Sequence, residues 1–246
     1  MLIPLKTPEI LTTPYYFSAT WDGLLNVQKV SGMASLPEKL RTATPKRIAE
    51  FLAGRFCAVK AIQAFRPDWS GEVGMNSDGS PRWPEGLVGS ITHTQGYAAA
   101  AVAPGGTWLS VGIDSEAMAD ADVLAAAKRV VMRNDERRLG ARLPIPEDQF
   151  ILLAFSAKES IYKCLYPLVK RSLEFSTVIL EDINIQNRSF TFNVPESIEP
   201  GLLSSSDAQG RFEFRAGRVH TGVELLDVRQ AGNVSRKSQG RGAESG

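Results

Sequence analysis

Three carboxylates in this sequence stand at positions that could hold a metal ion. Asp114 ends the apolar run "WLSVGID" and Glu116 follows two residues later, so both side chains point to one side of an extended chain. Glu159 lies in "FSAKESIYKCLYPL", a stretch with helical spacing, one turn before Lys163. Each feature has an ordinary alternative, because acids commonly end exposed strands and Glu–Lys pairs commonly lie on helix surfaces.

Together, the three acids would favour a divalent cation and phosphoryl chemistry. Carboxylates about 5 Å apart repel by roughly 3 kcal/mol per pair at an effective dielectric of about 20, so a cluster requires a cation or protonation. Oxygen ligands select hard ions, which makes Mg²⁺ the first expectation and Mn²⁺ its substitute. Because protein-bound magnesium shares its coordination shell with substrate phosphates, the acids indicate a phosphorylated substrate.

Basic residues provide a candidate phosphate site at the start of a helix. A helix is expected to begin after Thr44, with Lys46 and Arg47 in a first turn whose dipole attracts anions. Arg55 follows two turns later, and His93 ends the strand-like run "VGSITH". The alternatives are a solvated basic face and a capping histidine. The sequence contains no glycine-rich phosphate loop, so side chains would hold the phosphate.

The elements that must position these residues follow a repeated order. Helical spacing predicts helices over 45–62, 120–139 and 146–168, and strands are expected over 88–93, 97–103, 108–114, 177–185, 189–194, 211–215 and 218–228. The three central strands are expected to be joined by hairpin turns, "TQG" and "APGG". Residues 1–40 and 67–86 are expected to be irregular.

This order predicts an α+β fold of two similar α+β subdomains in a pseudo-two-fold arrangement, with Asp114 near the junction where ligands commonly bind. The predicted boundaries are 1–112 for the first subdomain, 113–230 for the second, which carries the metal ligands, and 231–246 for a disordered tail.

The composition is that of an ordinary globular protein of 246 residues with a formal net charge of +1. This balance indicates no nucleic-acid partner, and no apolar run approaches the roughly 20 residues that span a bilayer. The first residues lack a signal-peptide pattern, so we expect a cytoplasmic protein with reduced Cys57 and Cys164. Two histidines are too few for a histidine-rich zinc site.

Four stretches together resemble the 4′-phosphopantetheinyl transferases, over roughly residues 44 to 175. They are, in order, "KRIAEFLAGRFCA", "RWPEGLVGSITHTQGYAAA", "VGIDSE" and "LAFSAKESIYKCLYPLV". The resemblance is to the monomeric two-subdomain type, which includes the surfactin-synthetase activator and the enterobactin synthase component, and is greatest to the enterobactin-like branch.

This resemblance implies transfer of the phosphopantetheine arm from coenzyme A to a serine of an apo acyl or peptidyl carrier protein, giving holo carrier protein and 3′,5′-ADP. By matching position, Asp114, Glu116 and Glu159 would bind Mg²⁺ against the pyrophosphate of coenzyme A. Lys163 would contact that phosphate and assist proton removal or charge balance. The general base is Glu159, directly or through water, or another group of the site.

The resemblance also assigns the remaining coenzyme A contacts. Lys158 would be a further phosphate contact, Arg47 and Arg55 would hold the 3′-phosphate, and His93 would lie near the nucleotide phosphates. Basic residues over 129–138 and 170–171 are candidates for receiving an acidic carrier protein.

Two other functions remain open from the sequence. One is a non-catalytic protein that binds coenzyme A or a carrier on the same scaffold. The other is a metal-dependent nucleotide phosphohydrolase, which would need no protein acceptor. The sequence does not identify the carrier protein or pathway served.

Overall fold

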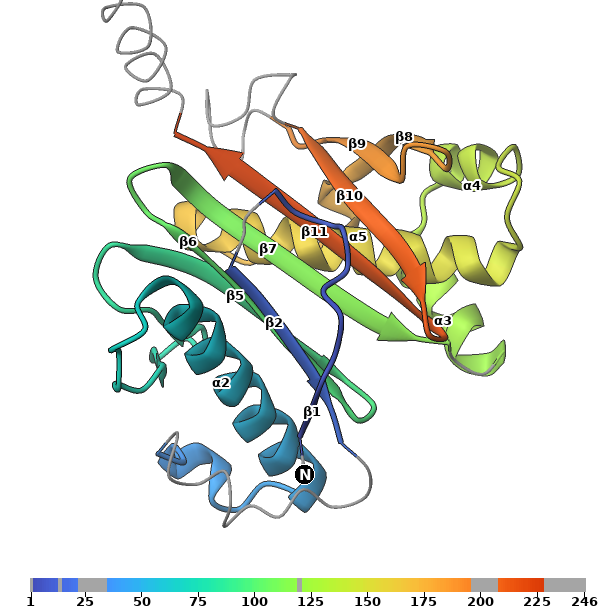
Figure 1. The fold of residues 1–246 in the computed structure, drawn as a ribbon. Helices are drawn as coiled ribbons and strands as arrows, with labels where there is room; N and C mark the ends of the chain where they lie inside the picture. Colours follow the sequence, from blue (N-terminus) through green and yellow to red (C-terminus); the bar gives the residue numbers. More distant parts are fainter. Residues whose placement is uncertain (1, 13–14, 22–34, 119–120, 196–207, 228–246) are drawn as a thin grey trace, which may run out of the picture.

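The structure is a computed structural model that describes residues 2–12, 15–21, 35–118, 121–195 and 208–227. Two antiparallel sheets lie next to each other, and each is covered by one long helix (Figure 1). This confirms the expected α+β class. The expected disordered tail, 231–246, lies outside the described residues.

The first sheet has the strand order β1-β2-β6-β5 and is covered by helix α2. Its elements are β1 (Ile3–Pro4), β2 (Tyr15–Thr20), α2 (Pro45–Phe65), β5 (Leu87–Thr94) and β6 (Tyr97–Pro104). Short pieces lie in the connections: η2 (Glu38–Leu40), β3 (Gly74–Met75) and β4 (Pro81–Arg82). The "TQG" hairpin between β5 and β6 forms as predicted.

The second sheet has the order β7-β11-β10-β9-β8 and is covered by α5. Its elements are β7 (Trp108–Ala117), α3 (Ala121–Val131), α4 (Asn134–Gly140), α5 (Glu147–Val169), η3 (Phe175–Thr177), β8 (Ile179–Asn184), β9 (Ser189–Asn193), β10 (Gln209–Arg215) and β11 (Arg218–Leu226). Its core combines leucine and isoleucine side chains of α5 with phenylalanines of the sheet.

Small side chains let β6 pack on both faces. Ala98 and Ala100 lie in the core beneath α2, whereas Ala99 and Ala101 lie in a cluster with Ile113 of β7. Alternate residues of a strand point to opposite faces, so the run "YAAAAVA" is buried by the helix on one side and by the second half on the other. β6 therefore lies at the centre of the molecule.

The two halves share one connectivity. In each half a strand precedes the long helix, and the last strand of that half returns antiparallel beside it: β2 pairs with β6, and β7 pairs with β11. The predicted boundary between residues 112 and 113 falls inside β7, which belongs entirely to the second sheet.

Two predictions about the chain path were wrong. The segment 1–40 was expected to be irregular, but Tyr15–Thr20 forms β2 inside the first sheet. The turn "APGG" was expected to close a hairpin, but β6 and β7 enter different sheets. In both cases the pairing partner is distant in sequence, and a local pattern does not contain it.

The predicted helix over 120–139 is divided into α3 and α4. The division occurs at Arg133, which takes an extended conformation and serves as the N-cap of α4. The side chain of Glu136 accepts a hydrogen bond from the backbone N–H of Arg133 at 2.9 Å, as in a capping box. The stretch that was predicted as one helix therefore forms two, and the second begins after Arg133.

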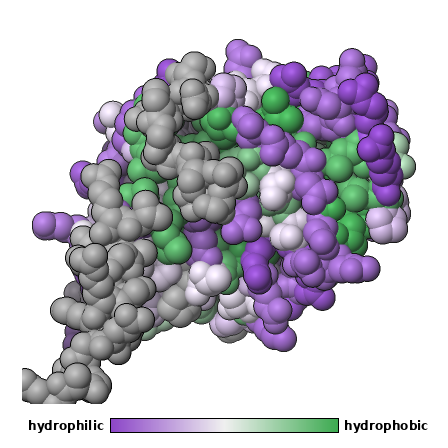
Figure 2. All heavy atoms as spheres, turned by 90° about the horizontal axis from the view of Figure 1, so that it is seen from above, coloured by the Kyte–Doolittle hydropathy of each residue, from purple (hydrophilic) through white to green (hydrophobic). Residues whose placement is uncertain are grey.

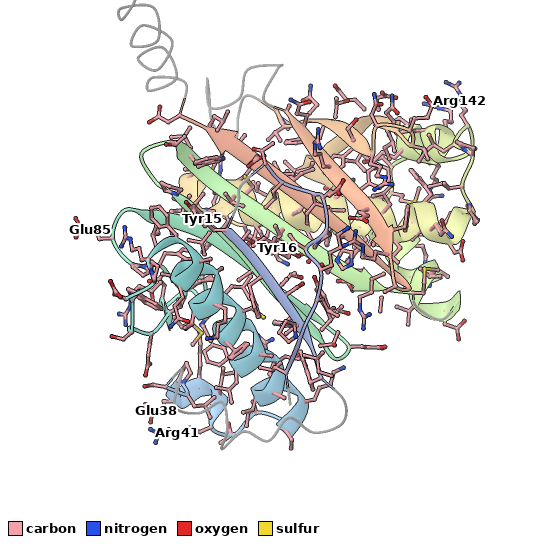
Figure 3. The ribbon with its side chains drawn as sticks, viewed as in Figure 1. Tyr15, Tyr16, Glu38, Arg41, Glu85 and Arg142 are labelled. Carbon is pink, nitrogen blue, oxygen red and sulfur yellow. The ribbon has the colours of Figure 1, made fainter. Side chains whose placement is uncertain are left out.

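The surface combines polar side chains with scattered apolar ones. Figure 2 shows hydrophilic side chains over much of the face seen from above, with hydrophobic groups exposed between them. Charged side chains such as Glu85 and Arg142 lie at the periphery, whereas Tyr16 lies in the interior (Figure 3). No helix within the described residues has the length and apolar character needed to cross a membrane.

Gly112 of β7 allows α5 to approach the second sheet closely. A Cβ at this position would clash with the backbone oxygen of Ser160 and the backbone nitrogen of Cys164. Because these are backbone atoms of a helix, they cannot move aside without displacing α5.

We predict that Gly112→Ala lowers the free energy of unfolding by about 1–3 kcal/mol, because the added methyl group overpacks the contact between helix and strand. Urea unfolding of the variant measures this loss. Gly106→Ala is the matched control, since a Cβ there meets no atom within 4 Å. Equal stability of the two variants would contradict the close approach of α5.

Candidate active site

Side-chain hydroxyls of β5 join the two sheets along the edge of β7. β5 lies beside β7, and Ser90 Oγ accepts a hydrogen bond from the N–H of Ile113 at 3.1 Å. Thr92 Oγ1 accepts from the N–H of Ser115 at 3.1 Å. β11 occupies the other edge of β7, so these N–H groups have no strand partner of their own. We call this row of contacts the hydroxyl seam.

The hydroxyl seam also places Asp114. Thr92 donates its hydroxyl hydrogen to Asp114 Oδ1 at 3.1 Å, and Lys163 Nζ of α5 lies 2.5 Å from the same oxygen. Asp114 is only 3% exposed, and its second oxygen, Oδ2, is buried without a hydrogen-bond partner among the described residues. A buried carboxylate oxygen without a partner is costly, which makes it a natural contact for a cation.

Glu116 and Glu159 lie in the same electrostatic environment. Burial and the negative charge of Asp114 raise the pKa of Glu116 to about 8. Burial also raises the pKa of Glu159, where Asp114 adds to the effect and Lys163 opposes it. The side chains of the three acids predicted from sequence therefore interact, and the negative charge of each one disfavours ionisation of the others.

These acids do not form a closed set of metal ligands as placed. Among the described residues, no group of three or more His, Cys, Asp or Glu side chains could hold a metal ion. Their chemistry nevertheless fits a hard divalent cation, because Asp114 Oδ2 has no partner among the described residues and the pKa of Glu116 is raised by burial and by the negative charges of Asp114 and Glu159. The acids also fit magnesium in kind, since all of the donors are oxygens.

Lys163 is the cation that balances the acids within the chain. Burial alone would lower its pKa, but the charge and hydrogen bond of Asp114, together with the charges of Glu159 and Glu116, outweigh that effect and raise the pKa above the ordinary value. Glu159 lies one helical turn before it and contributes in the same direction. Lys163 therefore remains an ammonium group and offers positive charge at the junction of the two halves.

Arg47 and His93 meet as two of the predicted phosphate contacts. Arg47 Nη1 lies 2.9 Å from His93 Nε2, which joins the first turn of α2 to the end of β5. Burial, followed by the charges of Arg47 and Lys163, lowers the pKa of His93 to about 4, so the imidazole is neutral and accepts from Arg47. Glu50 lies 3.9 Å from Arg47 and was not considered from sequence.

Arg55 is buried near these two residues. It is 5% exposed, its guanidinium lies 4.6 Å from the centre of the Phe51 ring, and its Nε has no hydrogen-bond partner among the described residues. Burial and the charge of Arg47 lower the pKa of Arg55 to about 10. A buried guanidinium with an unused donor beside a second cation is suited to an anionic ligand.

The structure corrects the phosphate contact predicted for Lys158. This residue is 1% exposed, and its ammonium donates to Glu136 Oε2 at 2.9 Å, to the carbonyl of Val131 at 2.7 Å and to that of Phe175 at 3.0 Å. An ammonium group has three hydrogens, so no donor remains for a phosphate. Helical geometry explains the difference from Glu159, since neighbouring helical residues point about 100° apart.

Two cavities adjoin the acids and Lys163. The larger, of about 460 Å³, has Lys163 in its wall and apolar walls from both halves, including Trp83, Val88 and Tyr166. The smaller, of about 210 Å³, is lined by Glu159 and by the segment Leu173–Val178. Tyr162 lines both cavities and lies between Glu159 and Lys163 in sequence.

The sequence reasoning missed the residues that support the site. The alternation of hydroxyls in "SITHT" was a signal for the hydroxyl seam, because Ser90 and Thr92 share one face of β5. Ser115, between the two acids of β7, points to the opposite face of the strand, where its Oγ lies 2.8 Å from His220 Nδ1. Glu136 gave no signal, since it lies in a stretch rich in charge.

We predict that His220 makes the stability pH-dependent. Burial, with the charges of Arg218 and Arg215, lowers its pKa to about 4 against the opposite effect of Glu213 and Asp114. The unfolded state, with a histidine pKa of about 6.5, therefore binds a proton first as the pH falls.

The contribution of His220 is complete above pH 6.5 and is lost as the pH falls towards 4. Relative to His220→Gln, the wild type should lose on the order of 2 kcal/mol of unfolding free energy between pH 7 and pH 5. Urea unfolding of both proteins at these two pH values measures the difference. Parallel curves would show that the imidazole does not titrate as stated.

Comparisons with known proteins identify the family of this chain. A family model of the 4′-phosphopantetheinyl transferase N-terminal domain matches residues 36–103, and a model of the 4′-phosphopantetheinyl transferase superfamily matches residues 110–213. The chain is 33% identical over 214 residues to 4′-phosphopantetheinyl transferase Svp of Streptomyces mobaraensis, covering 82% of this chain and 81% of the relative.

Two further relatives show how far the similarity extends. The chain is 35% identical to 4′-phosphopantetheinyl transferase PptT of Mycobacterium tuberculosis, over 79% of this chain and 87% of the relative. It is 36% identical to enterobactin synthase component D of Salmonella typhimurium over 51% of each chain. The two family models together cover residues 36–103 and 110–213, which include both long helices and Asp114, Glu116 and Glu159. The chain therefore belongs to the 4′-phosphopantetheinyl transferase superfamily and is an enzyme that uses coenzyme A to modify carrier proteins.

Proposed function

We propose that this enzyme transfers the 4′-phosphopantetheine arm of coenzyme A to a serine of an apo acyl or peptidyl carrier protein, with Mg²⁺ as the metal and Mn²⁺ as a substitute. The products are holo carrier protein and 3′,5′-ADP. The observation that carries the proposal is Asp114, a buried carboxylate at the junction of both halves with one oxygen on Lys163 and the other without a partner.

Asp114, Glu116 and Glu159 are the residues that would hold the ion. When bound, a divalent cation neutralises negative charge that develops on the phosphate oxygens. The three acids interact, and the pKa values of Glu116 and Glu159 are raised. A bound cation is therefore more favourable for these carboxylates than a site without one. Lys163 would supply a further positive charge beside the β-phosphate. Its ammonium group would then either break its contact with Asp114 Oδ1 or contact the phosphate and Asp114 Oδ1 together.

Arg47, Arg55 and His93 would bind the 3′-phosphate side of coenzyme A. Arg55 is held rigidly by burial beneath Phe51 and retains an unused donor, so it loses little freedom on binding an anion. The neutral imidazole of His93 orients Arg47. Positioning a remote phosphate in this way helps to place the reacting phosphorus.

The reaction itself exchanges one bond to phosphorus. The serine Oγ of the carrier forms a bond to the β-phosphorus of coenzyme A, and the bond from that phosphorus to the bridging oxygen breaks, so that 3′,5′-ADP leaves with the oxygen. The serine proton passes to Glu159, directly or through water, or to another base of the site. Burial raises the pKa of Glu159, which makes its carboxylate a stronger proton acceptor.

The carrier protein would dock beside α3 and α4. This region presents Arg129, Arg133, Arg137 and Arg138, together with the exposed apolar side chain of Val130. A basic and apolar surface complements an acidic carrier helix with an apolar stripe, as the resemblance implies.

One chain supplies residues from both sheets to the site, so we propose that the enzyme acts as a monomer. Buried free thiols at Cys57 and Cys164 are in keeping with a cytoplasmic setting.

A transfer assay tests the proposed function directly. Incubation with coenzyme A, Mg²⁺ and an apo carrier protein should add about 340 Da to the carrier, the mass of the arm delivered by metal-assisted phosphoryl transfer. Intact-mass spectrometry over a panel of fatty-acid, siderophore and polyketide carriers reads the result. Coenzyme A binding without any added mass would favour a non-catalytic binder, and cleavage of coenzyme A without a protein acceptor would favour a phosphohydrolase.

Removal of one acid should abolish transfer without unfolding the protein. We predict that Asp114→Asn and Glu159→Gln each lower the transfer rate about 100-fold or more, because each removes negative charge that the metal requires. Glu181→Gln, at an exposed position of β8, is the matched control. Near-normal transfer by either site variant, at unchanged melting temperature, would remove that acid from the proposed metal site.

The 3′-phosphate assignment can be tested by comparing two ligands. The wild type should bind coenzyme A about 10-fold or more tightly than 3′-dephospho-coenzyme A, since charge-assisted hydrogen bonds contribute about 1.5–3 kcal/mol. In Arg47→Ala and Arg55→Met this preference should shrink towards unity in isothermal titration calorimetry. Arg66→Met, at the far end of α2, controls for loss of a cation from this helix. An unchanged preference in both site variants would place the 3′-phosphate elsewhere.

A further inference from the structure

The buried pair of Lys158 and Glu136 connects α5 to four neighbouring segments. Lys158 Nζ donates to the carbonyl of Val131, at the C-terminal end of α3, and to that of Phe175, in η3. Carbonyls at the C-terminal end of a helix lack partners within that helix. Lys158 thus satisfies such a group at Val131, and its third hydrogen is held by Glu136.

Glu136 binds two further segments. Its Oε2 accepts from the N–H of Arg133, immediately before α4, and its Oε1 accepts from the N–H of Leu180 in β8, each at 2.9 Å. Glu136 itself is 0% exposed. Through one ion pair, α5 is therefore attached to the end of α3, the start of α4, η3 and the start of β8.

Stability alone does not account for such a pair. Replacing a buried ion pair by apolar residues of similar volume is often neutral or stabilising, because desolvation of two charges opposes their attraction. Apolar side chains could not, however, bind two backbone carbonyls and two backbone amides at once. What the pair adds is a fixed position for four segments relative to α5.

Two of these segments border the active site. The segment 173–178 faces Glu159 across the cavity of about 210 Å³, and Phe175 stacks on Phe155 of α5 with ring centres 5.4 Å apart. The end of α3 and helix α4 carry the arginines that we propose as the carrier docking surface: Arg129 in the last turn of α3, Arg133 before α4, and Arg137 and Arg138 in its last turn. Lys158 lies immediately before Glu159 in α5 and, although 1% exposed, also lines this cavity, so the pair adjoins the site.

We propose that Lys158 and Glu136 are positioning residues that hold the docking surface and the segment 173–178 in a fixed relation to Glu159. They govern transfer to the carrier protein and leave coenzyme A binding unchanged, because the residues that we propose for coenzyme A lie in the first half, in β7 and in α5 itself, outside the four segments that the pair attaches to α5. This inference rests on the proposed transfer and on the proposed docking surface.

Two variants and one control test the inference. Lys158→Met removes the ammonium group and leaves Glu136 buried without its cation. Lys158→Met combined with Glu136→Gln removes both charges, while the amide oxygen at position 136 still accepts from one of the two backbone amides. Lys60→Met is the matched control, because Lys60 is a partly buried helix lysine outside this network.

Three measurements read the outcome in each protein: carrier kinetics, coenzyme A affinity by calorimetry, and amide hydrogen exchange. For both variants we expect kcat/KM for the carrier to fall about 10-fold or more, since small displacements near the chemistry are costly. Coenzyme A affinity should stay within about twofold, a readout that general destabilisation would not preserve. Exchange should accelerate over 131–136 and 173–180 in Lys158→Met and remain unchanged over β5 and β6.

Several results would overturn the inference. One is transfer kinetics within about twofold of the wild type in the folded double variant. Another is a loss of coenzyme A affinity equal to the loss of transfer. The third is failure of both variants to fold, which would make the pair a general requirement of the fold. If the wild type transfers to no carrier, the proposed function fails, while hydrogen exchange still decides whether the pair holds these segments.

Discussion

The hydrogen bonds of the hydroxyl seam are the constraint on which the site depends. Thr92 joins the two sheets by accepting from the backbone of β7, and the same hydroxyl donates to Asp114. Because one hydroxyl makes both hydrogen bonds, the alignment of β5 with β7 and the position of Asp114 are set together. The closeness of α5 to β7 at Gly112 then brings Lys163 onto that acid.

Charge balance at this junction explains the other features of the site. The acids come from β7 and α5, and the cations come from α2 and α5. In a buried setting, opposite charges stabilise one another and like charges shift pKa values strongly, as at Glu116 and His93. The protein alone leaves Asp114 Oδ2 and Arg55 Nε without partners, one suited to a cation and one to an anion. A substrate carrying phosphates with a metal ion would satisfy both kinds of atom.

Helix α5 combines two functions on two faces. Glu159 and Lys163, four residues apart, interact with Asp114 and line the cavities. Lys158 points to the interior and holds the neighbouring segments through Glu136. The stretch "KES" therefore joins a buried structural ammonium to a carboxylate of the site, and the 100° step between helical neighbours is enough to separate them.

The sequence by itself determined the local features and the family. Helical spacing and the cap at Thr44 defined α2, extended spacing placed Asp114 and Glu116 on one side of a strand, and four motifs identified a 4′-phosphopantetheinyl transferase. The tertiary structure decided which groups meet. The pairing of β2 with β6, the separation of β6 from β7 and the capture of Lys158 by Glu136 all join residues distant in sequence. Periodicity reports which face of an element is buried, but the partner of that face depends on how the whole chain packs.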